Sequence, residues 1–442
     1  MKALPVSAWL SAPDSIVAWR GEQQLTRSLM RRQVLALSIR LKAESGTRWA
    51  LCFDDSYRFC VALLAAWYAS KMPVIPGHCR AGPLNEMRSS LDGVLSDMPL
   101  ELALPQLRWD DEEVDDELPP LPADATLILF TSGSTGTPRA VQKTLAVMER
   151  ESQWLADLWG QQVRDCRFIA SVSHQHLYGL SLRIFMPMAL SRPFAARAVF
   201  YSEQLAEQHP AHRYVFISSP AFLRRLDYSL RAPNCALIVS AGGMLGLTEA
   251  QQAQQALGCS VNEIYGSTET GVIAWRQIDS EMPIWQCFPD VLLRETDPGR
   301  WQVRSALIAD PEGCQLDDRL VTDAQGYFQL AGRHDRVVKI EDKRVSLSEI
   351  ERRVMALPGI VDAAALVTDR HGRRAIGVVV QTETLLSAGD VSLQKRVWRE
   401  QLTPWLEPVA MPRYWRVVGA IPVTSQSKRA WPDIEELFHV TD

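Results

Sequence analysis

The sequence lacks the features that would assign it to several specialised classes of protein. Its eight cysteines form no Cys-x-x-Cys pair, which argues against a zinc site or a disulfide framework and favours reduced thiols. Basic residues are not in excess, because 47 Lys and Arg stand against 52 Asp and Glu, and we expect no nucleic-acid partner. The longest apolar run, residues 59–69, is well short of the roughly 18 residues of a membrane-spanning helix. These absences favour a soluble, cytoplasmic protein without an integral membrane segment.

What is present is ordinary globular composition, with 47% hydrophobic and 22% charged residues, which excludes wholesale disorder. The N-terminal stretch MKALPVSAWLSA has one Lys and a Pro within a very short apolar part. We therefore expect it to begin the mature chain rather than to be a secretion signal.

Two patterns divide the 442 residues, a length that suggests about two or three domains. Up to about residue 332, short β-like runs alternate with helical segments, which predicts parallel α/β layers. Among these segments we expect a strand at residues 72–75 and helices at residues 145–159 and 221–230. Beyond about residue 332 the pattern predicts a smaller α+β unit. The expected fold class is therefore α/β, with a large layered N-terminal domain at residues 1–334 and a small α+β domain at 335–442. The stretch 109–122 is acidic and then Pro-rich, and we interpret it as a solvated surface linker.

The strongest local signal is the loop TSGSTGTPR at residues 131–139, which follows a β-like run and precedes a helical segment. Its glycines let backbone N–H groups approach an anion, its hydroxyls add donors and Arg139 adds a positive charge. A flexible Gly/Ser turn is the alternative. The residues concerned are Thr131, Ser132, Gly133, Ser134, Thr135, Gly136 and Arg139.

Two better-known motifs are absent from this loop. No Gly-Lys-Ser/Thr completes a Walker A motif, which argues against an unrelated ATP-hydrolysing or phosphoryl-transfer enzyme. Ser134 lies two residues after Ser132 rather than after Gly, so the loop is not a nucleophile elbow.

A second motif, YGSTETG at residues 265–271, follows a predicted strand. Thr268 offers a hydroxyl and Glu269 a carboxylate beside two glycines. A carboxylate next to phosphate-binding groups is a common way to hold Mg²⁺ with a nucleotide. A plain acidic turn is the alternative.

A pair of histidines, His174 and His176, lies in the segment SHQHLYGL. A metal site would need further ligands at suitable spacing, and the sequence offers none. Packed histidines are the ordinary alternative.

Six motifs together resemble the adenylate-forming enzymes, a superfamily of acyl- and aryl-CoA synthetases, nonribosomal-peptide adenylation domains and luciferases. They are FTSGSTGTPRAV, SAGGML, YGSTETG, GRHDRVVK, RVSLSEIE and PVTSQSKRAW, in that order between about residues 45 and 435. The resemblance implies a large N-terminal domain, a small mobile C-terminal domain and use of ATP with Mg²⁺.

The resemblance also implies roles for individual residues. The 131–139 loop would grip the β- and γ-phosphates of ATP, and Gly242, Gly243 and Met244 would lie beside the adenine. Tyr265, followed by Gly266, would stack on the adenine, Thr268 would bond the α-phosphate and Glu269 would hold Mg²⁺. Asp318, helped by Arg333, would bind the ribose, and Asp335 would be the hinge. Lys428 would bridge the attacking carboxylate and the α-phosphate. The expected lining of the acid pocket is His176, Tyr178, Ser218, Ser219, Met244 and Ile264.

The implied chemistry joins two anions. A carboxylate attacks the α-phosphorus of ATP to give an acyl-adenylate and pyrophosphate, and cations stabilise the accumulating charge. The adenylate is then attacked by a phosphopantetheine thiol, after the small domain has rotated about its hinge.

Departures from the family pattern concern the acceptor. Glu341 and Asp342 stand where the family usually has Gly in a loop near the pantetheine thiol, and Ser427 replaces the Gly before Lys428. Two carboxylates disfavour anionic free CoA, so we expect an acyl carrier protein, with CoA as the alternative.

The compact pocket resembles ligases that load acyl or aryl acids onto carrier proteins, including those of aryl polyene pathways. An aromatic acid is therefore the expected substrate, with a fatty acid as the alternative. A degenerate nucleotide-binding protein without turnover also stays open.

Overall fold

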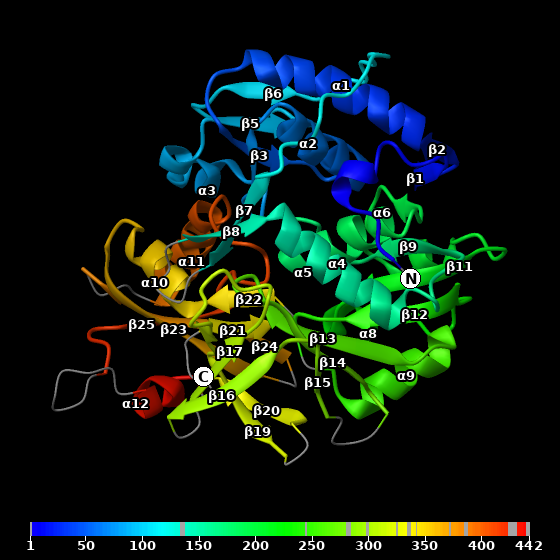
Figure 1. Ribbon diagram of the computed structural model, residues 1–442. Coiled ribbons are helices and arrows are strands. Elements are labelled where there is room, and N and C mark those ends of the chain that lie inside the picture. Colours follow the sequence, from blue (N-terminus) through cyan, green and yellow to red (C-terminus); the bar gives the residue numbers. More distant parts are fainter. Residues whose placement is uncertain are drawn as a thin grey trace. The chain divides into compact units, whose positions relative to one another are not determined.

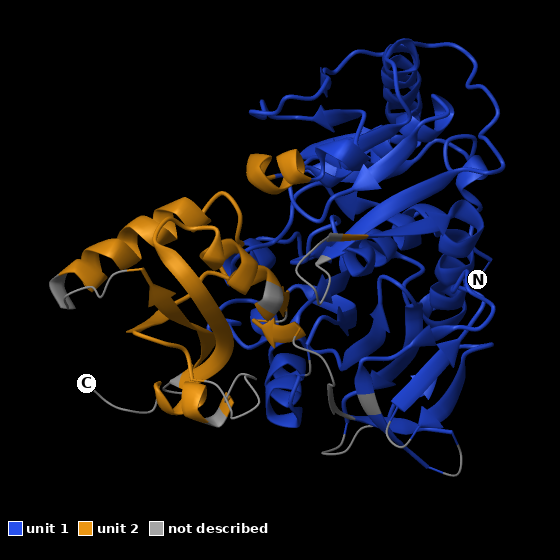
Figure 2. Cartoon of the chain, turned by 90° about the vertical axis from the view of Figure 1, so that its left-hand side faces the viewer, with its two compact units in different colours: residues 1–79, 87–131, 140–334 blue, residues 80–86, 132–139, 335–442 orange. Residues whose placement is uncertain are grey.

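The computed structural model forms two compact units (Figure 2). It describes residues 2–132, 138–243, 245–279, 284–297, 300–323, 326–333, 337–341, 343–370, 373–383, 388–422 and 431–438. Unit 1 comprises residues 1–79, 87–131 and 140–334, and unit 2 comprises residues 80–86, 132–139 and 335–442.

Unit 1 is built on a nine-stranded sheet in which parallel pairing runs from β13 to β1 (Figure 1). Strand β13 also pairs antiparallel with β14 through a tight turn. The order is β15 (Gln286–Cys287), β14 (Gly271–Gln277), β13 (Val261–Ser267), β12 (Asn234–Ser240), β11 (Arg213–Ser218), β9 (Cys166–Ala170), β10 (Phe194–Ala195), β1 (Ile16–Arg20) and β2 (Gln23–Thr26).

A second sheet of six strands also belongs to the N-terminal part of the chain. Its order is β6 (Gln106–Arg108), β5 (Gly93–Ser96), β3 (Arg48–Cys52), β4 (Met72–Ile75), β7 (Thr126–Ser132) and β8 (Pro138–Thr144). Smaller sheets contain β16 (Leu292–Asp297), β17 (Arg300–Arg304) and β18 (Cys314–Gln315), and β19 (Asp318–Thr322) with β20 (Phe328–Arg333).

The helices of unit 1 are α1 (Arg27–Ala43), α2 (Ser56–Tyr68), α4 (Leu145–Trp159), α5 (Leu177–Gly179), α6 (Met186–Ala189), α7 (Ser202–Ala206), α8 (Pro220–Leu223) and α9 (Leu247–Leu257). A π-helix spans Leu180–Phe185, and 3-10 turns span Val6–Ala8 and Arg88–Ser90. The apolar run of the sequence is helix α2, whose residues 59–66 are all buried. Asp55 caps this helix by accepting hydrogen bonds from the N–H groups of Tyr57 and Arg58.

Unit 2 contains a three-stranded sheet of β23 (Ile360–Arg370), β24 (Arg373–Thr382) and β25 (Tyr414–Val418). A hairpin of β21 (Val337–Ile340) and β22 (Lys343–Ser346) precedes it. The helices are α3 (Ala81–Glu86), α10 (Leu347–Met355), α11 (Ala388–Leu402) and α12 (Trp431–Glu436). In its core the rings of Trp398 and Trp415 stack with centroids 5.2 Å apart. The α/β fold class with a smaller C-terminal sheet domain is therefore confirmed.

One predicted helix is wrong. The segment 221–230 was expected to be helical throughout, but α8 ends at Leu223. Asp227 instead accepts hydrogen bonds from the N–H and the hydroxyl of Ser229. Such local side-chain bonds offer the backbone an alternative to the helix.

The acidic stretch after Trp109 lies along α1 rather than apart from it. Arg40 pairs with Asp110, and Arg32 pairs with Glu113 at 2.6 Å. The N–H of Val114 donates to the carbonyl of Arg32 at 3.2 Å. The stretch is thus a surface segment tied to a basic helix face. Among the residues that the structure describes, no helix is long and apolar enough to cross a membrane.

Candidate functional site

The carboxyl ends of β11, β12 and β13 bring several predicted pocket residues to one edge of the nine-stranded sheet. Ser218 pairs in register with Ser240, and Ser240 pairs with Glu263. Because these strands are parallel, the segments that follow them emerge at the same edge, where α/β sheets bind ligands. Ser219 directly follows β11, and Gly242 lies two residues after the end of β12. Gly242 has a φ of +95°, a conformation that favours glycine.

Tyr178, one of the expected pocket residues, contacts the ends of two of these strands. Its buried hydroxyl lies 3.0 Å from the carbonyl oxygen of Ser218 and 2.8 Å from that of Val239. Burial raises the pKa of Tyr178 well above its ordinary value. The hydroxyl therefore joins the ends of β11 and β12. The neighbouring Ser240 hydroxyl is buried and finds no partner within the described part of the chain.

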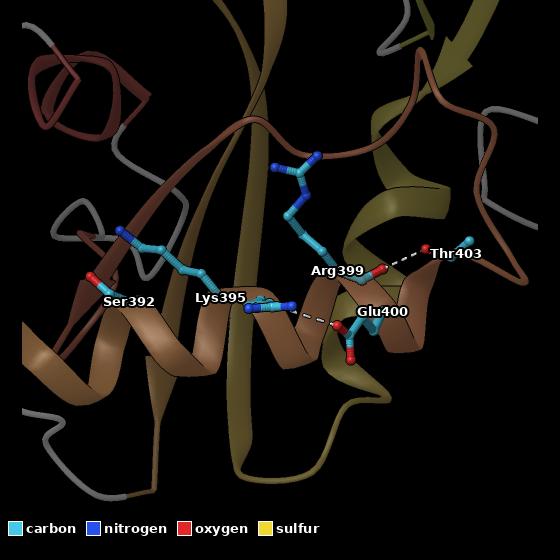
Figure 3. Close-up of a pocket in the computed structure, with 6 residues that line it drawn as sticks. Ser392, Lys395, Arg399, Glu400 and Thr403 are labelled. Atoms are coloured by element: carbon cyan, nitrogen blue, oxygen red, sulfur yellow. Dashed lines mark hydrogen bonds and ion pairs between the residues drawn. The ribbon is translucent and has the colours of Figure 1, made fainter.

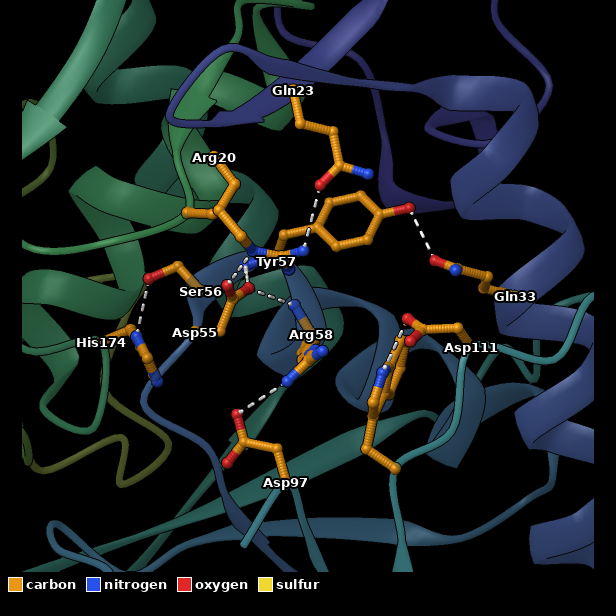
Figure 4. Close-up of polar contacts among 12 residues, drawn as sticks. Arg20, Gln23, Gln33, Asp55, Ser56, Tyr57, Arg58, Asp97, Asp111 and His174 are labelled. Atoms are coloured by element: carbon orange, nitrogen blue, oxygen red, sulfur yellow. Dashed lines mark hydrogen bonds and ion pairs between the residues drawn. The ribbon is translucent and has the colours of Figure 1, made fainter.

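The two histidines differ in their surroundings. His174 is 2% exposed, and its Nδ1 lies 2.9 Å from the Ser56 hydroxyl (Figure 4). Its Nε2 lies 2.9 Å from the Phe53 carbonyl. Burial lowers the pKa of His174 to about 3, so it is neutral and structural. His176 precedes α5, and its ring lies beside Gly77. Within the described residues, no three His, Cys, Asp or Glu side chains lie close enough together to hold a metal ion.

The turn between β13 and β14 presents Thr268 and Glu269, both half-buried. It is held from within, because the Ser267 N–H donates to the Thr270 hydroxyl at 3.0 Å and the Thr270 N–H to the Ser267 hydroxyl at 3.3 Å. At Gly271 the φ of +70° favours glycine.

Thr131, which the sequence places at the start of the phosphate loop, reaches this turn. Its hydroxyl lies 3.5 Å from Oε1 of Glu269, at the outer limit of a hydrogen bond. Three of the predicted phosphate and metal residues therefore lie together: Thr131, Thr268 and Glu269.

Two charged residues beneath the turn were not predicted. Nζ of Lys143 donates to the carbonyl of Glu269 at 3.0 Å and to that of Leu307 at 3.2 Å. Glu151 accepts a hydrogen bond from the N–H of Val272 at 3.0 Å. The sequence carries no signal for either residue, because β8 is mostly exposed and α4 carries several other charged residues.

A second group forms around the predicted ribose site. The hydroxyl of Tyr265 donates to Oδ2 of Asp318 at 2.9 Å. In the β19–β20 ladder Asp318 lies directly opposite Arg333. The Tyr265 ring packs against Trp285 and Phe328, with centroids 5.7 and 5.8 Å away. It is only 8% exposed, so little of its surface is open for stacking.

The remaining predicted residues are placed less completely. Arg139 is exposed in β8, Gly243 follows Gly242, and Ile264 is a buried residue of β13. For Ser132 and Arg333 only the backbone position is described. Outside the described residues lie Gly133, Ser134, Thr135, Gly136, Met244, Asp335, Asp342, Ser427 and Lys428.

An open pocket on α11 of unit 2 is lined by none of the predicted residues (Figure 3). Its walls are the exposed or half-exposed side chains of one helix face, and Arg396 pairs with Glu400 at 3.5 Å. This is the pattern of a solvated helix surface rather than of a built site. The lining residues are Ser392, Lys395, Arg396, Arg399, Glu400 and Thr403.

Comparison with known sequences supports the motif analysis. A family model described as AMP-binding enzyme matches residues 83–294. A 4-coumarate–CoA ligase of Cereibacter sphaeroides is 26% identical over 268 residues, covering 58% of this chain and 59% of that protein. An L-proline–[L-prolyl-carrier protein] ligase of Streptomyces coelicolor is 27% identical over 305 residues, covering 58% and 56%. The chain therefore spans less than two thirds of the length of these curated relatives.

Solved structures share the fold over nearly the whole chain. A double mutant of the o-succinylbenzoate CoA synthetase of Bacillus subtilis has a TM-score of 0.80, 15% identity and coverage of 97% of this chain and 98% of that one. A malonyl-CoA ligase with methylmalonyl-CoA and AMP bound has a TM-score of 0.79, 21% identity and coverage of 95% and 100%. Residues 83–294 therefore match the AMP-binding enzyme family, and the chain shares the fold of these CoA ligases over nearly its whole length.

Proposed function

We propose that the protein is an AMP-forming acid–thiol ligase. It activates a carboxylic acid with ATP as an acyl-adenylate, releases pyrophosphate and transfers the acyl group to a phosphopantetheine thiol. The observation that supports this most is the grouping of Thr131 with the Thr268–Glu269 turn in an AMP-binding domain. The hydrogen-bonded pair of Tyr265 and Asp318 lies in the same unit, and these two residues would bind the nucleoside part of ATP.

The chemistry of these residues suits a nucleotide with a divalent cation. Glu269 offers carboxylate oxygens, and Thr131 and Thr268 offer hydroxyls, which are the hard donors that Mg²⁺ prefers. Mg²⁺ bound here would neutralise phosphate charge. The buried Ser240 hydroxyl, with no partner among the described side chains, lies at the strand end where the adenine is expected.

The roles of the protein's own groups follow from their chemistry. Thr268 orients the α-phosphate, and Glu269 holds the metal. Asp318 and Arg333, opposite each other in the ladder, fix the ribose. Lys428 provides the cation between carboxylate and α-phosphate, and residues 131–139 orient the outer phosphates. Asp335 is the hinge between residues 1–334 and 335–442.

The acid pocket follows the sheet edge of β11 to β13. We expect its wall to be formed by His176, Tyr178, Ser218, Ser219, Met244 and Ile264. The hydroxyl of Tyr178 is anchored at the carbonyls of Ser218 and Val239. We propose an aromatic acid as substrate, with a fatty acid as the competing outcome.

An acyl carrier protein is the proposed acceptor. Glu341 has a φ of +45°, which is in the left-handed region that favours glycine. The adenylate-forming enzymes usually have Gly in this loop. The acidic side chains of Glu341 and Asp342 disfavour the phosphates of free CoA. Thiolation measured side by side with CoA and with a holo-carrier protein decides this point. Efficient formation of a CoA thioester alone would contradict the carrier proposal.

Lys428→Ala tests the reaction itself, because it separates the two half-reactions. We expect adenylate formation, followed as acid-dependent pyrophosphate release, to be nearly abolished. Thiolation of a supplied acyl-adenylate should stay largely intact, because no α-phosphate is attacked in that step. Equal loss of both half-reactions would refute the assigned role of Lys428.

A further inference from the structure

Lys143 and Glu151 are buried charges to which neither the motifs nor the proposed reaction assigns a role. Lys143 is 4% exposed in β8, and Glu151 is 2% exposed in α4. Burial of an ionised group is costly unless partners compensate it. Burial lowers the pKa of Lys143 and raises that of Glu151, and each charge opposes the shift of the other. A pair of apolar side chains would fill this space at a lower cost, so the pair needs another explanation.

Lys143 and Glu151 each bind one end of the same turn and one group elsewhere in unit 1. Nζ of Lys143 binds the carbonyl of Glu269 at 3.0 Å and that of Leu307 at 3.2 Å. Glu151 accepts from the N–H of Val272 at 3.0 Å through one oxygen and from the hydroxyl of Ser181 through the other. The backbone on both sides of residue 270 is therefore held by a buried charge.

The space around the turn is shaped to admit the Glu151 carboxylate. A Cβ atom placed on Gly271 would lie 2.7 Å from Oε2 of Glu151 and 2.8 Å from a methyl carbon of Leu307. Any larger residue at position 271 would displace the carboxylate from the Val272 N–H. Gly271, Glu151 and Lys143 together thus fix the position of the backbone at Glu269.

We propose that Lys143 and Glu151 are positioning residues that fix the Thr268–Glu269 turn for the metal-bound triphosphate. The inference rests on the proposed function, because it assigns these two side chains to the metal and phosphate end of that site. Neither residue touches the nucleotide. Each acts through the backbone of the turn, whose carbonyl and N–H groups they hold in place.

The test compares Lys143→Met with a matched control, Lys71→Met. Lys71 also bridges two backbone carbonyls, those of Glu44 and Gly46, each at 2.6 Å. For Lys143→Met we expect the Mg²⁺ concentration at half-maximal adenylation to rise about tenfold or more. Thiolation of a supplied adenylate should change less than about twofold. Lys71→Met should leave the Mg²⁺ profile unchanged. Lys143→Arg, which keeps a charged donor, should restore part of the profile.

Thermal unfolding of each variant separates positioning from general loss of structure. A Lys143→Met protein that is folded and keeps the wild-type Mg²⁺ profile would overturn the inference. Parallel loss of both half-reactions, with no change in the Mg²⁺ profile, would also overturn it. If wild-type protein releases no pyrophosphate with any acid, the proposed function fails. Calorimetry of ATP binding at graded Mg²⁺ then still distinguishes Lys143→Met from Lys71→Met.

Discussion

Unit 1 contains two partly buried polar clusters whose bonds end on different kinds of partner. The first, which we call the helix-cap cluster, surrounds the start of α2 (Figure 4). The second, the turn cluster, surrounds the turn between β13 and β14. Both contain opposite charges and hydrogen bonds between distant segments. The helix-cap cluster comprises Arg20, Asp55, Ser56, Arg58, Asp97 and His174, and the turn cluster comprises Thr131, Lys143, Glu151, Glu269 and Gly271.

In the helix-cap cluster the bonds join one structural element to another. Asp55 caps α2 and accepts from Nε of Arg20 in β1 at 2.8 Å. His174 joins the Ser56 hydroxyl to the Phe53 carbonyl, each at 2.9 Å. The result is a fixed junction between the two sheets of unit 1.

In the turn cluster the bonds end on the backbone that carries the proposed phosphate and metal residues, Thr268 and Glu269. Lys143 and Glu151 hold the carbonyl of Glu269 and the N–H of Val272, while the Glu269 side chain stays half-buried. The comparison teaches that burial and charge alone do not identify a functional residue. The position of its bonding partners does.

The largest expected effect is on activity and comes from Glu269→Gln. Loss of the carboxylate charge weakens metal binding, so adenylation at low Mg²⁺ should fall by about 10² to 10³-fold, or about 2.7 to 4 kcal/mol. Higher Mg²⁺ should recover part of the rate. Pyrophosphate release against Mg²⁺ concentration measures this, with Asp55→Asn as the control from the helix-cap cluster. An unchanged profile would exclude Glu269 as a metal contact.

Gly271→Ala should combine a loss of stability with a loss of metal affinity. The left-handed backbone costs an alanine about 1 to 2 kcal/mol, and the clash with Glu151 adds about 1 to 3 kcal/mol. Gly258 is the matched control, because its φ is +67° and no atom lies within 4 Å of an added Cβ. Urea denaturation of both variants gives the difference. If Gly271→Ala and Gly258→Ala lower the unfolding free energy equally, the close approach of Gly271 to Glu151 contributes nothing to stability.

Ser56→Ala should destabilise the protein without affecting the Mg²⁺ profile. It removes the partner of one His174 nitrogen in a buried site, and an unsatisfied buried group costs about 1 to 3 kcal/mol. Denaturant unfolding and the Mg²⁺ titration, run on the same preparation, check both halves of this statement. A shifted Mg²⁺ profile would mean that the two clusters are coupled.

The helix-cap cluster should also make stability depend on pH. Burial, assisted by the nearby charge of Arg183, lowers the pKa of His174 to about 3. Below about pH 6.5 the unfolded chain binds a proton that the folded chain does not, so stability falls as the pH falls from 6.5 towards 3. Between pH 7.5 and 5.5 the wild type should lose about 1.4 kcal/mol more than His174→Gln. Equal losses would show that His174 does not titrate in this way.

The smallest expected effect comes from the surface pairs that tie the acidic segment to α1. Arg32 and Glu113 lie 2.6 Å apart, with side chains 33% and 41% exposed. Exposed pairs of this kind contribute about 0 to 1 kcal/mol. Arg32→Ala should therefore lower the unfolding free energy by less than about 1 kcal/mol and leave activity unchanged. A larger loss would mean that the segment contributes to the core of unit 1.

Much of the fold could be predicted from the sequence, because the hydrophobic periodicity of a segment and the capping residues at its ends indicate the same element. The helix expected at 145–159 is the observed α4, capped by Thr144, whose hydroxyl accepts from the Val147 N–H. The strand expected at 72–75 is the observed β4. The helix expected at 221–230 failed, because local bonds of Asp227 override its apolar spacing.

The site divides in the same way. The side chains proposed to face a ligand occur in compact motifs, so Thr268, Glu269 and Asp318 could be proposed from the sequence. Lys143 and Glu151 could not, because their partners are backbone groups more than 100 positions away along the chain. The roles of His174 and Tyr178 likewise depend on carbonyl partners that only the folded chain supplies.

The central claim is that this chain adenylates a carboxylic acid, and the identity of its nucleotide product tests that most directly. ATP and Mg²⁺ are incubated with aromatic acids and with fatty acids of graded length, and the nucleotides and phosphates are separated. The account predicts AMP and pyrophosphate in equal amounts, formed with only a few of the acids and lost in Lys428→Ala. ADP and phosphate, or no acid-dependent product despite measurable ATP binding, would contradict it.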